Sequence, residues 1–161
     1  MDARFLNMET GFQNDTLLVQ TRNGLDDVLL EVLEFLDYDG TLYRAPIGST
    51  TDGLSTPKIV RVIPGYDATG DDWWSGVLHD SGYRDYLQTF TGVWVKARLT
   101  QKQCDHLILA AMKSQGVGFS RRHIIFFALR LFGSFAFKGD RAAARQRNQA
   151  PQPPTPPSPS P

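Results

Sequence analysis

Residues 77–86 read VLHDSGYRDY, and residues 104–112 read CDHLILAAM. We expect one helix to carry each stretch, and we arrange the rest of the predicted fold around this pair. A helix advances about 100° per residue, so His79 and Tyr83, four residues apart, share one face. Asp80 projects to the side of that face. The first helix therefore presents a histidine, a carboxylate and an aromatic hydroxyl close together.

These residue types suit a hydrolytic site. A histidine can take a proton from water, one carboxylate can orient its ring, and another can hold a hard cation. If the two helices pack at the usual distance of about 8–10 Å, Asp105 on the second helix can face back toward His79. Tyr83 can donate a hydrogen bond to such a carboxylate. The alternative is structural: His79 packs against neighbouring aromatic rings, and Asp80 caps the helix or pairs with Arg84.

Three helices are expected, the first over about 71–86. The second begins after Thr100, which forms a capping box with Gln103, and ends near Gly116. The third begins after Ser120 and ends at Gly133. This third helix is apolar nearly all round but shorter than the roughly 20 residues of a membrane span, so we expect a buried core helix. A helix lying at a membrane surface, with arginines at head-group level, stays open as the alternative.

The N-terminal third is expected to form a small antiparallel sheet. Residues 26–38 fit a helical stripe as well as a strand, but they run into the hairpin-turn signal Tyr38–Thr41. We therefore favour strands, which we place at about 29–37 and 41–47, with a shorter one near 15–21. Residues 48–72 follow as an extended loop rich in glycine and proline, and loops of this length are often functional.

A small sheet followed by three helices predicts a single α+β domain over residues 1–139. Residues 140–161 are rich in alanine, arginine, glutamine and then proline, and we expect a disordered tail there. The single cysteine, Cys104, excludes an internal disulfide framework, and it lies on the predicted buried stripe of its helix. The first residues do not show a signal-peptide pattern.

A formal net charge of zero conceals a strong asymmetry. Residues 1–40 hold nine acids and two bases, whereas residues 113–161 hold eight bases and one acid. Either the two halves neutralise each other in the fold, or a basic face meets phosphates, lipid head groups or an acidic partner. We find no glycine-rich phosphate loop and no recognisable nucleic-acid module. The histidines lack the HxxxH or HExxH spacing of zinc hydrolases.

The two quoted stretches resemble the active-site helix pair of the phospholipase A2 superfamily, especially its small bacterial and fungal members. The resemblance covers roughly residues 76–113. It implies cation-assisted hydrolysis of a lipid ester, with Ca²⁺ as the expected cofactor and these roles: His79 as the base, Asp80 as a calcium ligand, Tyr83 as a supporting hydroxyl and Asp105 as the acid that orients the imidazole. The disulfides and the glycine-rich calcium loop of that superfamily are missing. The nearest substitute for the loop is Gly48–Ser55, where Asp52 could donate a carboxylate to the metal or simply form a turn.

A wider pattern resembles an uncharacterised family of tailed phages and prophages, the domain of unknown function 1353 type. It consists of YRAPIG at 43–48, TDGLSTP at 51–57, the HDxxY and CDxxxxxAM motifs, and ALRLFG at 128–133.

Together the two resemblances imply a phage-encoded domain, present in the host cytoplasm during infection or in the virion. One hypothesis is an ester or lipid hydrolase that meets a lipid surface. The other is a non-enzymatic virion or assembly accessory protein that binds other phage proteins and keeps the helix pair as a scaffold.

Overall fold

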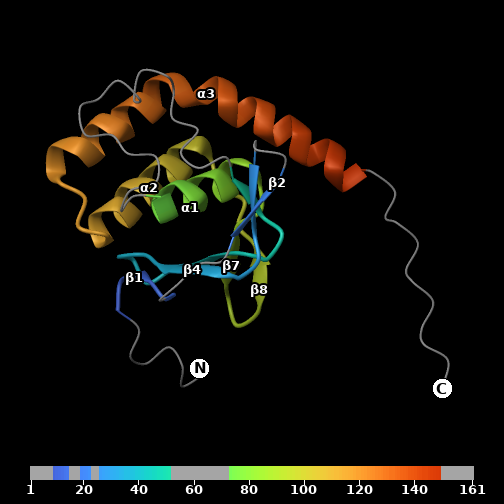
Figure 1. Cartoon of the computed structure of the whole chain (residues 1–161), viewed down its shortest axis with the longest axis horizontal. Helices are drawn as coiled ribbons and strands as arrows, with labels where there is room; N and C mark the ends of the chain where they lie inside the picture. Colours follow the sequence, from blue (N-terminus) through green and yellow to red (C-terminus); the bar gives the residue numbers. More distant parts are fainter. Residues whose placement is uncertain (1–8, 15–18, 23–25, 52–72, 150–161) are drawn as a thin grey trace.

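The computed structural model describes residues 9–14, 19–22, 26–51 and 73–149, and it confirms the α+β class. The helices and strands, in chain order, are β1 (Gly11–Phe12), β2 (Val19–Arg22), β3 (Asp26–Leu29), β4 (Leu33–Leu36), β5 (Leu42–Ala45), β6 (Thr50–Thr51), α1 (Trp73–Tyr83), β7 (Gln88–Phe90), β8 (Trp94–Lys96), α2 (Gln101–Ser114) and α3 (Phe119–Gln149). The three helices gather on one side of the molecule with α3 outermost, and most strands lie on the other side (Figure 1).

The strands form two antiparallel sheets. One has five strands in the order β1-β4-β5-β7-β8, and the other has three in the order β2-β3-β6. The predicted hairpin is present as β4 and β5, with Leu33 opposite Ala45 and Leu36 opposite Leu42. Gly40 in its turn has a φ of 84°, a conformation that glycine adopts without strain. Strand rather than helix was therefore the right choice for this segment.

The strand boundaries differ from the prediction in three places. The expected strand over 29–37 is divided, because β3 ends at Leu29 in the small sheet and β4 begins at Leu33 in the large one. The strand near 15–21 is found as β2, which begins at Val19, and residues 15–18 lie outside the described residues. The expected loop over 48–72 begins with the short strand β6, and its residues 52–72 also lie outside them.

Sequence reasoning missed β7 and β8, which lie between the first two helices. β7 pairs with β5 and β8 pairs with β7, so the large sheet is completed after α1. Each strand has only three residues, which is too short for the alternation of apolar and polar residues to show.

Helix α1 is central to the fold, since every residue from Ser75 to Tyr83 is buried. Its Val77 and Leu78 join a core cluster with residues of both sheets and of α2. The predicted capping box of α2 is present. The predicted buried stripe of this helix is also found, since these apolar residues are buried: Cys104, Leu107, Ile108, Ala111 and Met112. A Cβ atom on Gly82 would lie 2.9 Å from Sγ of Cys104, so this glycine lets α1 and α2 approach closely.

The predicted end of the third helix at Gly133 is wrong. Helix α3 continues through Gly133 to Gln149 and has 31 residues in all. A Cβ atom at position 133 would lie 2.5 Å from Oη of Tyr83. The glycine therefore serves the close approach of α3 to α1, and packing overrides its weak helix propensity.

The expected start of the disordered tail at Asp140 is also wrong, because α3 extends to Gln149. Arg141 anchors this part of the helix. Its Nη2 donates to the carbonyl oxygens of Gly82 at 2.9 Å and Leu99 at 2.7 Å, and its Nη1 pairs with Asp85. These contacts fix residues that composition alone assigned to a tail. Residues 150–161 lie outside the described residues.

Helix α3 is not the buried core helix that we expected. Ile125 and Leu129 are buried in a small cluster with Ile108 and Met112 of α2. The opposite side of α3 exposes several large apolar side chains, because α1 and α2 cover only one face of it. No described helix is both long and apolar enough to cross a bilayer.

We predict that Gly133→Ala lowers the free energy of unfolding by about 1–3 kcal/mol, as overpacking in a core usually does. The added methyl group would push on the Tyr83 hydroxyl, which is buried and bound to Asp105. Gly139→Ala is the matched control on the same helix, since beyond its chain neighbours and the nearby helix backbone no described atom lies within 4 Å of the place that its new methyl group would take. That change should leave stability equal or raise it by up to about 1 kcal/mol. Urea unfolding of both variants measures the difference, and equal effects would contradict the packing role of Gly133.

Candidate active site

The packing of α1 against α2 brings together His79 and Asp105, the two central residues of the predicted site. Nε2 of His79 on α1 lies 3.3 Å from Oδ1 of Asp105 on α2. Both side chains are buried, and Asp105 has no exposed surface. A carboxylate can only accept hydrogen bonds, so this contact places the ring proton of a neutral His79 on Nε2. The other ring nitrogen, Nδ1, is then free of that proton and able to accept one.

Asp105 accepts hydrogen bonds from two neighbouring helices. Oη of Tyr83 on α1 donates to Oδ1 at 2.6 Å, and Nη1 of Arg130 on α3 donates to Oδ2 at 3.0 Å. Burial alone would raise the pKa of Asp105, but the hydrogen bonds from His79, Tyr83 and Arg130 outweigh it and hold the pKa below its usual value. The carboxylate is therefore ionised at neutral pH. The pKa of Tyr83 is raised, mainly by burial and then by its bond to Asp105.

Sequence reasoning missed the role of Arg130. There this residue occurs only as part of the ALRLFG pattern at 128–133. The available signal was physical: a guanidinium in a helix that packs on the core needs an acidic partner. The pairing with Asp105 could not be located without knowing that α3 crosses the helix pair.

His79 is held between two acids. Its Nδ1 lies 3.7 Å from Oδ1 of Asp80, and its ring lies against the ring of Tyr83 with centroids 4.0 Å apart. Burial lowers the pKa of His79, but the hydrogen bond to Asp105, the close contact with Asp80 and the charges of these two acids raise it by more, so the net shift is upward. The imidazolium form is thus favoured relative to a free histidine.

The metal residues predicted from the resemblance have different outcomes. Asp80 lies beside His79, and its Oδ2 accepts a hydrogen bond from Oγ1 of Thr51 at 2.7 Å. Asp52 lies outside the described residues. Within the described part of the chain, no three His, Cys, Asp or Glu side chains form a group that could hold a metal ion. Since Ca²⁺ takes six to eight oxygen ligands, the described donors do not by themselves complete a calcium site.

Cys104 is a packed thiol, as expected from its place on the buried stripe. Burial, only partly offset by the charge of Arg141, raises the pKa of this thiol to about 12. A thiolate nucleophile is therefore unfavourable here at neutral pH.

A cavity of about 310 Å³ opens between α1 and α3 and reaches the histidine. Both polar and apolar side chains line it; the lining residues are His79, Asp80, Tyr83, Arg84, Leu129, Phe132, Gly133, Phe135, Ala136 and Asp140. A cavity with convergent polar groups, a titratable pair and an apolar wall has the usual composition of a small-molecule site.

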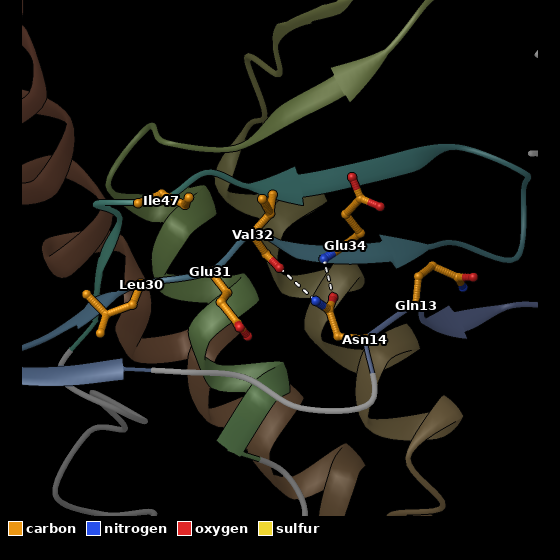
Figure 2. Close-up of a pocket in the computed structure, with 7 residues that line it drawn as sticks. All are labelled: Gln13, Asn14, Leu30, Glu31, Val32, Glu34 and Ile47. Atoms are coloured by element: carbon orange, nitrogen blue, oxygen red, sulfur yellow. Dashed lines mark hydrogen bonds between the residues drawn. The ribbon is translucent and has the colours of Figure 1, made fainter.

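A second pocket, of about 530 Å³, is larger but lacks such a pair (Figure 2). It lies where the two sheets meet and is lined by Gln13, Asn14, Leu30, Glu31, Val32, Glu34 and Ile47. The Asn14 side chain donates to the Val32 carbonyl at 2.7 Å and accepts from the Glu34 amide at 2.8 Å, so it extends the pairing of β4 beyond β1 (Figure 2). Because its lining includes no histidine or cysteine, we place the candidate active site in the cavity between α1 and α3.

A family model described as "Protein of unknown function (DUF1353)" matches residues 28–129. The chain belongs to this family. The match confirms the family that the wider sequence pattern indicated, and it includes His79, Asp80, Tyr83 and Asp105 but ends one residue before Arg130. A search of curated proteins and a search of solved structures each found no match. The family description names no activity for this DUF1353 chain.

We predict a pH-dependent contribution of His79 to stability. Its folded pKa is raised, so protonation stabilises the fold fully below its ordinary value of 6.5, and this stabilisation is lost as the pH rises through the folded pKa. Urea unfolding from about pH 5.5 to 9 should show this decline in the wild type. His79→Gln should lack it, while Asp105 stays ionised over the whole range. Parallel pH profiles for the two proteins would contradict the raised pKa.

Proposed function

We propose that this chain is a phospholipase A2-like hydrolase of carboxylic esters, with His79 as the general base. The observation that supports this most directly is the contact of His79, which lines the cavity, with the buried, ionised Asp105. A base oriented by a carboxylate and placed in a cavity is the arrangement that proton abstraction from water requires.

In the proposed reaction, Nδ1 of neutral His79, the form present above its raised folded pKa, removes a proton from water as the water oxygen attacks the ester carbonyl carbon. Asp105 holds Nε2–H and stabilises the imidazolium that forms. The tetrahedral intermediate then collapses, the ester C–O bond breaks, and the imidazolium returns the proton to the leaving alkoxide. Tyr83 and Arg130 act through Asp105 as positioning residues, because their hydrogen bonds fix the orientation of its carboxylate.

The lining of the cavity supports an ester with an acyl chain. His79, Asp80, Arg84 and Asp140 provide polar groups beside which an ester and a charged head group would lie. Leu129, Phe132, Phe135 and Ala136 of α3 provide apolar surface for hydrocarbon. A phospholipid or a comparable lipid ester combines these two parts. Dependence on Ca²⁺, through Asp80 and Asp52, stays a prediction from the phospholipase resemblance.

The proposal includes a phage origin, with the protein acting in the host cytoplasm during infection or as part of the virion. Its support is the resemblance of the sequence pattern to proteins of tailed phages and prophages.

A second candidate function is structural. The complete burial of Asp105, and its hydrogen bonds to residues of α1 and α3, would suit a scaffold that holds three helices together. A virion or assembly accessory protein could keep this network with no chemistry. The cavity beside His79 favours the enzyme, since a purely structural network has no need of one.

We predict that the purified chain hydrolyses phospholipid and short-chain ester substrates above background. His79→Gln should reduce the rate by at least about 100-fold, the lower range for loss of a general base. His106→Gln on the exposed side of α2 is the matched control and should retain the rate. Asp80→Asn, assayed with and without Ca²⁺, tests whether a cation takes part: loss of a calcium-dependent rate supports that role.

Two outcomes would favour the scaffold instead. One is equal turnover in the wild type and His79→Gln. The other is no hydrolysis by a folded wild type on any ester offered, together with a large loss of stability in Asp105→Ala, since removing one partner of a buried ion pair typically costs about 3–5 kcal/mol.

A further inference from the structure

Helix α3 presents a continuous row of exposed apolar side chains. Ile124, Phe127, Leu131 and Phe135 follow one another at spacings of three and four residues, which places them on one side of the helix. Their exposed fractions are 48, 58, 72 and 88%. We call these four residues the α3 apolar face. A contiguous apolar surface of this kind usually marks a site of interaction.

Basic residues lie at both ends of this face. Arg121 precedes it, and Lys138 and Arg145 follow within about 20° of Phe127 around the helix. The helix as a whole has seven bases and one acid. An apolar face flanked by Lys and Arg is the pattern of helices that lie in the surface of an anionic membrane. A second copy of the chain is a poorer occupant, because either orientation of two such helices sets bases against bases.

The α3 apolar face continues into the candidate active site. Phe135 belongs to the face and also lines the cavity that contains His79, and the neighbouring Phe132 lines it too while being 52% exposed. A surface that contacts the face would therefore meet the apolar wall of the cavity. A phospholipid could pass from a membrane to His79 along this wall without its acyl chain entering water.

We propose that the α3 apolar face docks the protein on an anionic phospholipid surface, with the cavity opening toward the head groups. The docking itself stands on the exposed face and its flanking charges. That the docked lipid is also the substrate rests on the proposed function.

The test is sedimentation of the full chain with two kinds of vesicle, phosphatidylcholine alone and an equal mixture of phosphatidylcholine and phosphatidylglycerol. We expect binding to the mixed vesicles that weakens with salt. The double variant Phe127→Ser, Leu131→Ser should bind at least tenfold more weakly, and neither residue lines the cavity. The control variant Val93→Ser, Val95→Ser changes exposed valines at β8 and should bind as the wild type does.

Hydrolysis of a soluble short-chain ester, measured on the same proteins, separates this proposal from the proposed function. Weaker vesicle binding by the α3 double variant with an unchanged ester rate supports both. Vesicle binding by a wild type that hydrolyses nothing supports docking and overturns the hydrolase. No binding of the wild type to mixed vesicles overturns docking, whatever the ester rate. So does a dimer in sedimentation velocity that the α3 double variant abolishes, since the occupant would then be a second copy.

Discussion

The buried carboxylate of Asp105 is the constraint on which the helical layer depends. An ionised group with no exposed surface is tolerated only when hydrogen bonds and opposite charges surround it, because its desolvation otherwise costs several kcal/mol. Here the partners are His79 and Tyr83 from α1 and Arg130 from α3. No single neighbouring helix supplies all three. The carboxylate thus fixes how α1 and α3 lie against α2.

Two glycines make this arrangement sterically possible. Gly82 admits the side chain of Cys104 between α1 and α2, and Gly133 admits the hydroxyl of Tyr83 between α1 and α3. The second contact matters most for the site, because that hydroxyl is the same one that binds Asp105. Helix packing and the orientation of the imidazole are therefore coupled. A change that separates α3 from α1 would also loosen the acid that holds His79.

Local patterns in the sequence were sufficient for the parts of the structure that depend on near neighbours. Helical spacing placed His79 and Tyr83 on one face, and a capping box marked the start of α2. The contact of His79 with Asp105 also followed, since two adjacent helices have few ways to pack. The turn signal at Tyr38–Thr41 decided correctly between helix and strand for residues before it.

What could not be predicted depends on contacts between distant parts of the chain. Thr51 binds Asp80 across 29 positions, and Arg130 binds Asp105 across 25. Arg130 in a packed helix required an acidic partner, but the sequence did not indicate which acid, and nothing marked Thr51 as a partner of Asp80. Gly133 was misinterpreted as a helix end because glycine often ends a helix. Here its lack of a side chain makes room for the hydroxyl of Tyr83 on α1. The three-residue strands β7 and β8 are held by β5 rather than by any pattern of their own.

The third helix shows why an apolar composition does not determine burial. Its sequence is apolar nearly all round, yet α1 and α2 can cover only one side, where Ile125 and Leu129 are buried. The side that includes Leu131 and Phe135 stays exposed beside the cavity of His79. Phe135 belongs both to this exposed side and to the lining of the cavity, so a change at this residue would alter the surface of α3 and the candidate site at the same time.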